Sequence, residues 1–186
     1  MPDGSLYLHQ RNYSIKTDGT ETADEFFIFN NGTIERYFKG FFDSAEEPLK
    51  TTAQKMFEFE DGQISQCDVN YVDNIDGEQT SSKQYLFNKK GKISACAVDY
   101  KEEKNGSISA KTVFNYKNGR LSQIKTKYQA YPKNHIATAQ KNFTLDDYVN
   151  HIKSCEINNT GLTTDNFDIH NLNAQKIANY SRNWGY

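Results

Sequence analysis

The sequence predicts a mainly β protein: an antiparallel meander of about nine strands, curved into a barrel or half-barrel and followed by two C-terminal helices. Three observations lead to this fold class. One motif recurs four times, with its glycines about thirty residues apart. Between these glycines, apolar and polar residues alternate as they do in half-buried strands. Aromatic side chains are abundant, with 12 Tyr and 12 Phe in 186 residues, so that rings supply much of the apolar area.

Each copy of the motif predicts a β-hairpin. It consists of two aromatic residues one residue apart, a polar turn, a glycine, and an Ile or Leu two residues later. Asn or Asp followed by Gly favours a tight hairpin turn, because both residues tolerate positive φ. The four copies occupy residues 27–34, 57–64, 85–93 and 114–121.

The apolar pattern sets the strand boundaries. After the Ile or Leu of the motif comes a step of three residues, as from Ile64 to Cys67 and from Ile93 to Cys96, and then a period of two. A β-bulge at that step would restore the alternation and turn the strand. Pro132 is expected to end the series, because proline cannot donate to a strand ladder. The predicted strands are 5–16, 24–29, 33–42, 52–59, 63–72, 79–87, 92–100, 107–116 and 120–130.

Residues 133–186 are predicted to be a helical segment packed on the sheet of residues 1–132, within a single domain. Thr144 to Asp147 resembles a capping box, and Leu145, Tyr148, Val149 and Ile152 follow with helical spacing. A second helix is expected from about 171 to 182. Two helices cover only about 20 Å, whereas nine flat strands span roughly 40 Å. The sheet itself is therefore expected to curl around its aromatic side chains.

The cysteines point to a reducing compartment. Cys67 and Cys96 are equivalent positions of successive units, separated by an intervening strand and so by roughly 9–10 Å. This exceeds the limit of about 7 Å for a disulfide, so both are expected to be free, buried and inert thiols. The chain shows no signal peptide and no apolar run that could cross a bilayer. We therefore expect a cytoplasmic protein without a membrane partner.

The net charge of −2 conceals a large asymmetry along the chain. Residues 1–82 hold six Lys or Arg and sixteen Asp or Glu, whereas residues 83–133 hold twelve and three. Such a split either reflects solvated faces that differ in charge or steers a charged partner. The longer loops are acidic and form the predicted partner-binding surface: Glu46, Glu47, Asp73, Asp76, Glu78, Glu102 and Glu103.

A basic strand pair lies on the other side of this split. Lys111, Lys125 and Lys127, near tyrosines, are a possible nucleic-acid surface. The stacking motifs of the usual nucleic-acid-binding modules are missing from the sequence, however. This argues against nucleic acid as the partner.

The sequence offers little catalytic chemistry, and neither a metal nor a cofactor is predicted. His151 and Cys155 have the spacing of two ligands on a helix, but no further ligand is near them in sequence. Asp73 and Asp76 resemble a fragment of a calcium loop that lacks its final Glu. No catalytic residue is assigned.

The four hairpin copies resemble two families of bacterial β-hairpin repeats. One is the tyrosine–aspartate repeat of Rhs-type toxin shells, and the other is the MORN-like repeat of antitoxin-component proteins. The resemblance covers residues 27–128 and rests on the segments that end in Gly-Thr-Ile, Gly-Gln-Ile, Gly-Lys-Ile and Gly-Arg-Leu. It implies a binding scaffold of the toxin–immunity type, and it carries no catalytic residues.

Three functional hypotheses follow. The first is a non-enzymatic protein-binding module, of the bacterial immunity or antitoxin type, that inhibits a basic toxin through its acidic surface. The second is a carrier for a small apolar ligand, lined by Phe59, Tyr71, Phe87 and Tyr100. The third is an enzyme that acts through Asp165, Asp168 and His170, or through the His151 pair.

Overall fold

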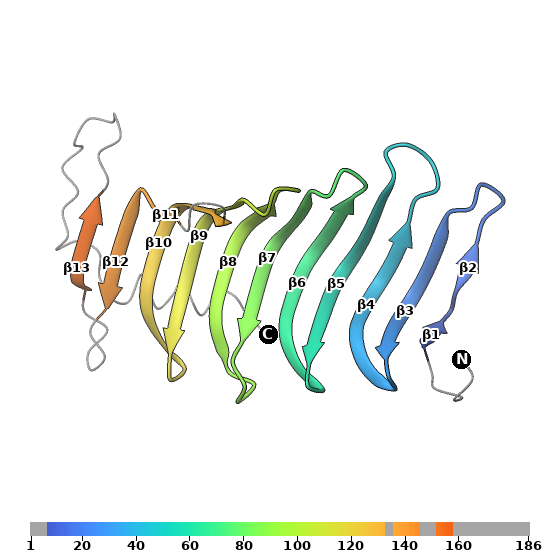
Figure 1. Cartoon of the computed structure of the whole chain (residues 1–186), viewed down its shortest axis with the longest axis horizontal. Helices are drawn as coiled ribbons and strands as arrows, with labels where there is room; N and C mark the ends of the chain where they lie inside the picture. The colour runs from blue at the N-terminus through green and yellow to red at the C-terminus, as the bar shows by residue number, and fades with distance from the viewer. Residues whose placement is uncertain (1–6, 133–135, 146–151, 158–186) are drawn as a thin grey trace.

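The computed structural model describes residues 7–132, 136–145 and 152–157, which form one antiparallel sheet of 13 strands (Figure 1). The strand order is β1-β3-β4-β5-β6-β7-β8-β9-β10-β12-β13, with β2 beside β3 and β11 beside β10. The strands are β1 (Leu8–Arg11), β2 (Ser14–Ile15), β3 (Glu21–Asn30), β4 (Thr33–Asp43), β5 (Lys50–Glu60), β6 (Gln63–Asn74), β7 (Gln79–Phe87), β8 (Ile93–Glu102), β9 (Ile108–Lys117), β10 (Arg120–Tyr131), β11 (Ile136–Thr138), β12 (Lys141–Leu145) and β13 (Ile152–Ile157).

The predicted meander is confirmed for its long strands. Strands β3 to β10 agree with the predicted strands to within three residues at each end. The predicted strand 5–16 is instead two short strands, β1 and β2, with Asn12 at positive φ between them. The described residues contain no helix that is long and apolar enough to cross a membrane.

The described sheet is open, so of the two predicted alternatives, a barrel or a half-barrel, the barrel is wrong. Its two outermost strands, β1 and β13, do not pair with each other. The physical reason lies in the direction of the curvature: each long strand bends along its own length, while neighbouring strands follow one another in a row (Figure 1). Closure requires strands that tilt and stagger steadily around an axis.

The predicted bulges are confirmed in all four hairpins. Each hairpin shows a register shift two residues from its turn: between Ile28 and Phe29, Glu58 and Phe59, Leu86 and Phe87, and Leu121 and Gln123. The extra residue is a serine in three hairpins, and its hydroxyl donates to a carbonyl of the paired strand. The bonds are Ser65 Oγ to Glu58 O (3.2 Å), Ser94 Oγ to Leu86 O (3.1 Å) and Ser122 Oγ to Asn115 O (3.0 Å).

A second irregularity recurs eight residues after each hairpin glycine. Gly40, Asn70, Asp99 and Lys127 all have positive φ, between 47° and 65°. Each breaks the alternation of its strand, so that residues three apart, such as Phe38 and Phe41, share one face. These positions bend β4, β6, β8 and β10. The sequence analysis missed them, although their constant offset from the hairpin glycines was visible.

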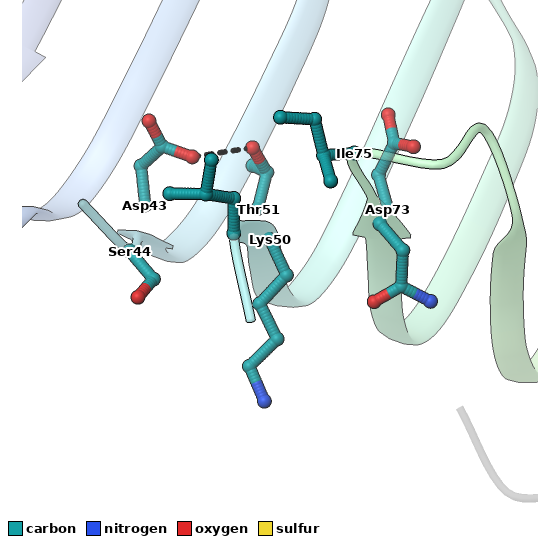
Figure 2. A pocket seen from close by; sticks show the side chains of 8 residues that line it. Asp43, Ser44, Lys50, Thr51, Asp73 and Ile75 are labelled. Atoms are coloured by element: carbon teal, nitrogen blue, oxygen red, sulfur yellow. Dashed lines mark hydrogen bonds between the residues drawn. The ribbon is translucent and has the colours of Figure 1, made fainter. Parts of the chain in front are cut away.

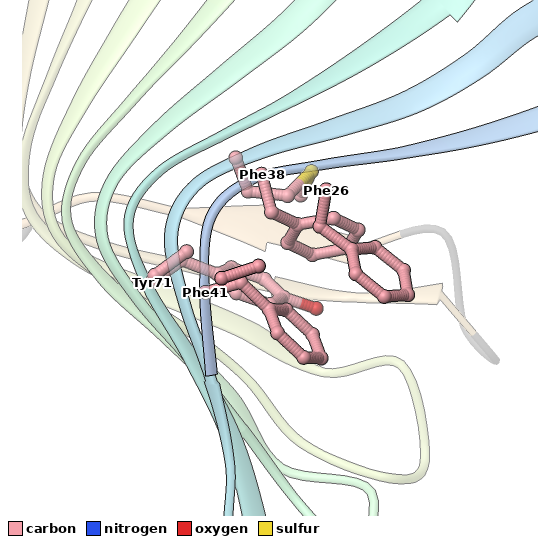
Figure 3. Packing of buried hydrophobic residues seen from close by; sticks show 7 residues of the cluster. Phe26, Phe38, Phe41 and Tyr71 are labelled. Atoms are coloured by element: carbon pink, nitrogen blue, oxygen red, sulfur yellow. The ribbon is translucent and has the colours of Figure 1, made fainter. Parts of the chain in front are cut away.

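The bend creates an inner face that holds much of the core. Figure 3 shows Phe26, Phe38, Phe41 and Tyr71 on the inner side of the bent strands. Phe26 and Phe41 stack with ring centroids 4.3 Å apart, and Ala23 and Ala53 leave room opposite the larger side chains. The outer face carries a separate buried cluster near the C-terminal end of the sheet: Cys96, Phe114, Ile124, Phe143 and Leu145.

The first predicted helix is wrong at both of its ends. Thr144 and Leu145 belong to β12, and Ile152 begins β13, which pairs with β12. The exposed edge of β10 supplies backbone partners for β12, and Phe143 and Leu145 are buried there. The sheet also continues beyond Pro132, which was predicted to end it. The second predicted helix, 171–182, lies outside the described residues.

Candidate interaction surface at the long-loop edge

Three acidic connections emerge along one edge of the sheet. They follow β4, β6 and β8, and an antiparallel meander places every second connection at the same edge. We call residues 43–50, 73–79 and 101–108 the long-loop edge. All seven predicted partner-binding residues lie there. Four of them are exposed: Glu46, Glu47, Asp76 and Glu103. The other three are half-buried: Asp73, Glu78 and Glu102.

Buried rings position the carboxylates at the strand ends. The Tyr71 hydroxyl donates to Asp73 Oδ2 at 3.2 Å, and the Tyr100 hydroxyl donates to Glu102 Oε2 at 2.8 Å. Burial, more than the neighbouring carboxylate, raises the pKa of both tyrosines, so both hydroxyls stay protonated donors. Hydroxyl groups of buried core tyrosines therefore hold the carboxylates of Asp73 and Glu102 in position.

Asp43 is the equivalent carboxylate in the first unit, and the sequence analysis did not name it. It follows Phe41 by two residues, as Asp73 follows Tyr71. Its Oδ1 accepts a hydrogen bond from Thr51 Oγ1 at 2.6 Å. The repeated spacing, in which an acidic residue follows an aromatic residue by two positions, would have identified Asp43 from the sequence.

Backbone hydrogen bonds hold the connections in place. Ser44 N donates to Lys50 O at 3.0 Å, and Asn74 N donates to Glu78 O at 2.9 Å, so each connection is closed at its base. Ile75 N donates to Leu49 O at 3.1 Å and joins two neighbouring connections. The long-loop edge is thus a preformed surface, which lowers the entropy lost when a partner binds.

Lysine neutralises only part of this edge. Lys101 Nζ lies 2.6 Å from Glu78 Oε2 and 3.8 Å from Glu103 Oε1, and its hydrogen bond to Glu78 is the main cause of its raised pKa. The ion pairs found among the described residues include none of the acids of the first connection. The uncompensated negative charge is therefore greatest around β4 to β6.

A pocket of about 310 Å³ lies at this acidic end, between the first two connections (Figure 2). Asp43 and Asp73 stand on either side of Thr51 and Ile75, and the Lys50 side chain points away from both aspartates. Ile75 is 71% exposed, so its apolar side chain is open to contact with a partner. Carboxylates beside an apolar contact suit a lysine or arginine side chain, which has an aliphatic stem and a charged head. The lining residues are Asp43, Ser44, Leu49, Lys50, Thr51, Asp73, Asn74 and Ile75.

The predicted ligand lining is not brought together. Tyr71 and Tyr100 are buried on the inner face, within separate clusters. Phe59 and Phe87 lie beyond the bulges, two residues from Phe57 and Tyr85 of the outer face. Four rings divided between two faces of an open sheet cannot enclose one apolar molecule.

The remaining chemical candidates divide into two groups. Asp165, Asp168, His170 and His151 lie outside the described residues, so the enzyme hypothesis stays a prediction. Cys67 and Cys96 are free and buried, with Tyr85 between them in the register, and burial raises the pKa of each thiol to about 11. Within the part of the chain that the structure describes, no group of three or more His, Cys, Asp or Glu could hold a metal ion.

The predicted basic surface is partly occupied by contacts of its own. Lys111 Nζ lies 3.9 Å from Asp99 Oδ2, and Lys125 Nζ lies 5.4 Å from the centre of the Tyr128 ring. Lys127 is one of the residues at positive φ that bend the strands. Lys111 and Lys125 therefore have partners within the sheet, and Lys127 lies at a bend of β10.

No family model and no curated protein sequence matches the chain. Among solved structures, two of TarM align over 68% of this chain and 20% of theirs. One is an S. aureus TarM variant in complex with fondaparinux, α-GlcNAc-glycerol and UDP (11% identity, TM-score 0.30), and the other has 12% identity and a TM-score of 0.31. A porin-like protein from Bacteroides uniformis aligns over 78% of this chain and 53% of its own, with 16% identity and a TM-score of 0.26. This chain thus spans about a fifth of TarM, and alignments this weak support no conclusion about function.

Proposed function

We propose that this protein is a non-enzymatic protein-binding module that holds a basic protein at its long-loop edge, as a bacterial immunity protein or antitoxin holds a toxin. The observation that carries the proposal is the gathering of carboxylates from three separate connections on one preformed edge. The long-loop edge has eight Asp or Glu and three Lys. A field of this kind speeds the encounter with a cationic partner and disfavours acidic ones.

The pocket between Asp43 and Asp73 is the proposed anchor of this interface. An arginine or lysine of the partner would place its head group near the carboxylates and its stem against Ile75. Arginine suits the site better, because its planar head can bond to more than one carboxylate. In this proposal the protein works in the cytoplasm, where Cys67 and Cys96 remain reduced.

The test begins with the partner that the native chain retains from its own cells. We expect a basic protein, encoded by a neighbouring gene, and association is then followed by stopped-flow fluorescence. Reversing Glu46, Glu47 and Asp76 to Lys should slow association at least about tenfold at low salt, because steering is lost. These three side chains are exposed, but Asp76 Oδ1 accepts a hydrogen bond from Glu78 N at 3.0 Å, so far-ultraviolet circular dichroism checks that the fold is intact.

A matched control has acidic charges at the opposite edge of the sheet. Glu35→Lys, Glu60→Lys and Asp61→Lys together reverse three exposed charges at or beside the hairpin turns that lead into β4 and β6. This variant should associate nearly as fast as the native protein. Equal slowing by both variants, or an association rate that does not depend on salt, would contradict the proposed interface.

A further inference from the structure

The outer face of β3 to β8 carries an apolar band that lies apart from the long-loop edge. Phe27 stacks on Tyr37 with ring centroids 4.5 Å apart, and Tyr37 stacks on Phe57 at 5.5 Å. The rings are half-buried, whereas the equivalent Phe114 and Ile124 farther along the sheet are buried. We call these ten residues the outer-face band: Phe27, Phe29, Ile34, Tyr37, Phe57, Phe59, Ile64, Tyr85, Phe87 and Ile93.

A row of lysines borders this band. Lys39 and Lys55 are directly opposite each other across β4 and β5, two residues from Tyr37 and Phe57 and therefore on the same face. Lys83 continues the row on β7, two residues from Tyr85. The positions of Lys55 and Lys83 on this face agree with their electrostatic effect on the thiols of Cys67 and Cys96.

Lys39 lies between Glu25 of β3 and Lys55 of β5, and Glu25 is already paired with Arg11 and accepts a hydrogen bond from the Tyr37 hydroxyl. Like charges directly opposite each other on a sheet repel, and both side chains are exposed. The ion pairs found among the described residues involve neither of them. An acidic group that binds between these lysines would relieve the repulsion, so the row is complementary to a negatively charged partner.

The dimensions of the band match an α-helix laid across the strands. From β3 to β8 the band extends about 24 Å, at about 4.8 Å between strands, which equals a helix of about 16 residues. Along the strands, the two apolar rows and the lysine row together span about 13 Å, close to the diameter of a helix with its side chains. Lys55 and Lys83 are two strands, or about 10 Å, apart, which is nearly two helical turns.

Two other anionic partners fit the band less well. A single-stranded nucleic acid needs free ring faces for its bases, but Phe27, Tyr37 and Phe57 cover one another's faces. An anionic membrane would meet the whole surrounding surface, and residues 1–82 carry ten more acidic than basic residues. A helix contacts only the band and its lysine row.

We propose that the outer-face band binds an amphipathic α-helix of a protein partner, with an apolar stripe on the rings and acidic residues facing Lys39, Lys55 and Lys83. This site is distinct from the long-loop edge and does not depend on the function proposed for that edge. The helix would lie on this apolar face of the sheet and contact it through residues at positions i, i+3, i+4 and i+7.

The proposal is tested by selecting binders from a library of helical 18-residue peptides displayed on phage, with the whole chain as the target. Selected peptides are expected to share an apolar stripe flanked on one side by Glu or Asp. Their affinity, measured by fluorescence anisotropy, should fall at least tenfold with Lys39→Glu combined with Lys55→Glu. These substitutions are on exposed side chains, and far-ultraviolet circular dichroism checks that the sheet is intact.

The matched control changes two lysines of the long-loop edge. Lys50→Glu with Lys104→Glu alters the net charge by the same amount and should leave peptide affinity within about twofold. The proposal is overturned if the selection yields no acidic helices, if both variants weaken binding equally, or if vesicles of phosphatidylglycerol bind while helices do not. Loss of binding in the control alone would place the helices on the long-loop edge and would equally overturn it.

Discussion

Asp68 and Gln84 face each other across β6 and β7 on the inner face, and both are nearly inaccessible to solvent, at 2% and 8% exposure. Met56 lies on the other side of Asp68 in the same cross-strand row. Gln66 Nε2 donates to Asp68 Oδ2 at 2.7 Å. Asp68 therefore lies between the apolar side chain of Met56 and the amide groups of Gln66 and Gln84. Burial is the main cause of its raised pKa.

The raised pKa of Asp68 predicts a pH dependence of stability. The folded state favours the protonated acid more than the unfolded state does, so this group lowers the free energy of unfolding as pH rises above the ordinary carboxyl range of about 4. Asp68→Asn removes the ionisation and keeps the shape. We expect the variant to gain stability relative to the native protein between pH 5 and 8, as measured by urea unfolding. Asp61→Asn, at an exposed hairpin turn where Asn31 and Asn118 are the equivalents, is the control that removes a carboxylate from the surface. A difference in stability between Asp68→Asn and the native protein that does not grow as the pH rises would contradict the raised pKa of Asp68.

The serine hydroxyls at the bulges should contribute to stability. Ser65→Ala, Ser94→Ala and Ser122→Ala each remove one hydrogen bond to a carbonyl of the paired strand, and each is expected to cost about 0.5–1.5 kcal/mol. Glu35 occupies the same bulge position in the first hairpin. Glu35→Ser should therefore be neutral or stabilising by up to about 1 kcal/mol. Denaturant midpoints test both directions, and a loss of stability in Glu35→Ser would show that the four bulges are not equivalent.

The bending positions should respond in opposite ways to substitution. Gly40 has a φ of 65°, and a Cβ placed there would approach Gln54 Cγ at 2.9 Å. Gly40→Ala should destabilise the protein by about 1–2 kcal/mol, because an L side chain disfavours this conformation. At the equivalent positions, glycine adopts positive φ freely, so Lys127→Gly should be stabilising. Asn70→Gly should be close to neutral, because the same gain is offset by the lost hydrogen bond from Asn70 Nδ2 to Ser82 Oγ at 3.1 Å. The melting temperatures of the three variants test this prediction. An unchanged melting temperature in Gly40→Ala would contradict the proposed role of Gly40 in bending β4.

The two described thiols should react slowly in the folded protein. Cys67 and Cys96 are buried, and the pKa of each is about 11, so little thiolate is present at pH 8. In a Cys155→Ser background, iodoacetamide should leave both unmodified in buffer and modify both in concentrated urea. Mass spectrometry counts the adducts. Rapid labelling of either thiol in the native state would show that the outer face opens at that point.

Local patterns were sufficient to predict the strands from β3 to β10 and the four bulges. Hairpin turns, period-two alternation and the step from Ile64 to Cys67 depend on residues close in sequence, so each can be recognised without the rest of the chain. The seven acidic residues of the predicted surface were likewise placed at one edge correctly, because meander topology alone assigns every second connection to the same side.

Long-range contacts decided the rest. The sequence predicted a helix beginning at Thr144, but the edge of β10 offers backbone partners that a capping pattern cannot anticipate, and a strand forms. The bends at Asn70 and Asp99 carry no glycine to signal them, and they are held by the core on which the strands fold. Barrel closure depends on how successive strands stagger, which is a property of the whole sheet. Sequence alone therefore determined the repeating hairpin. The tertiary structure decided that the hairpins form an open, bent sheet, because pairing between successive strands and burial on its inner face outweigh local preference.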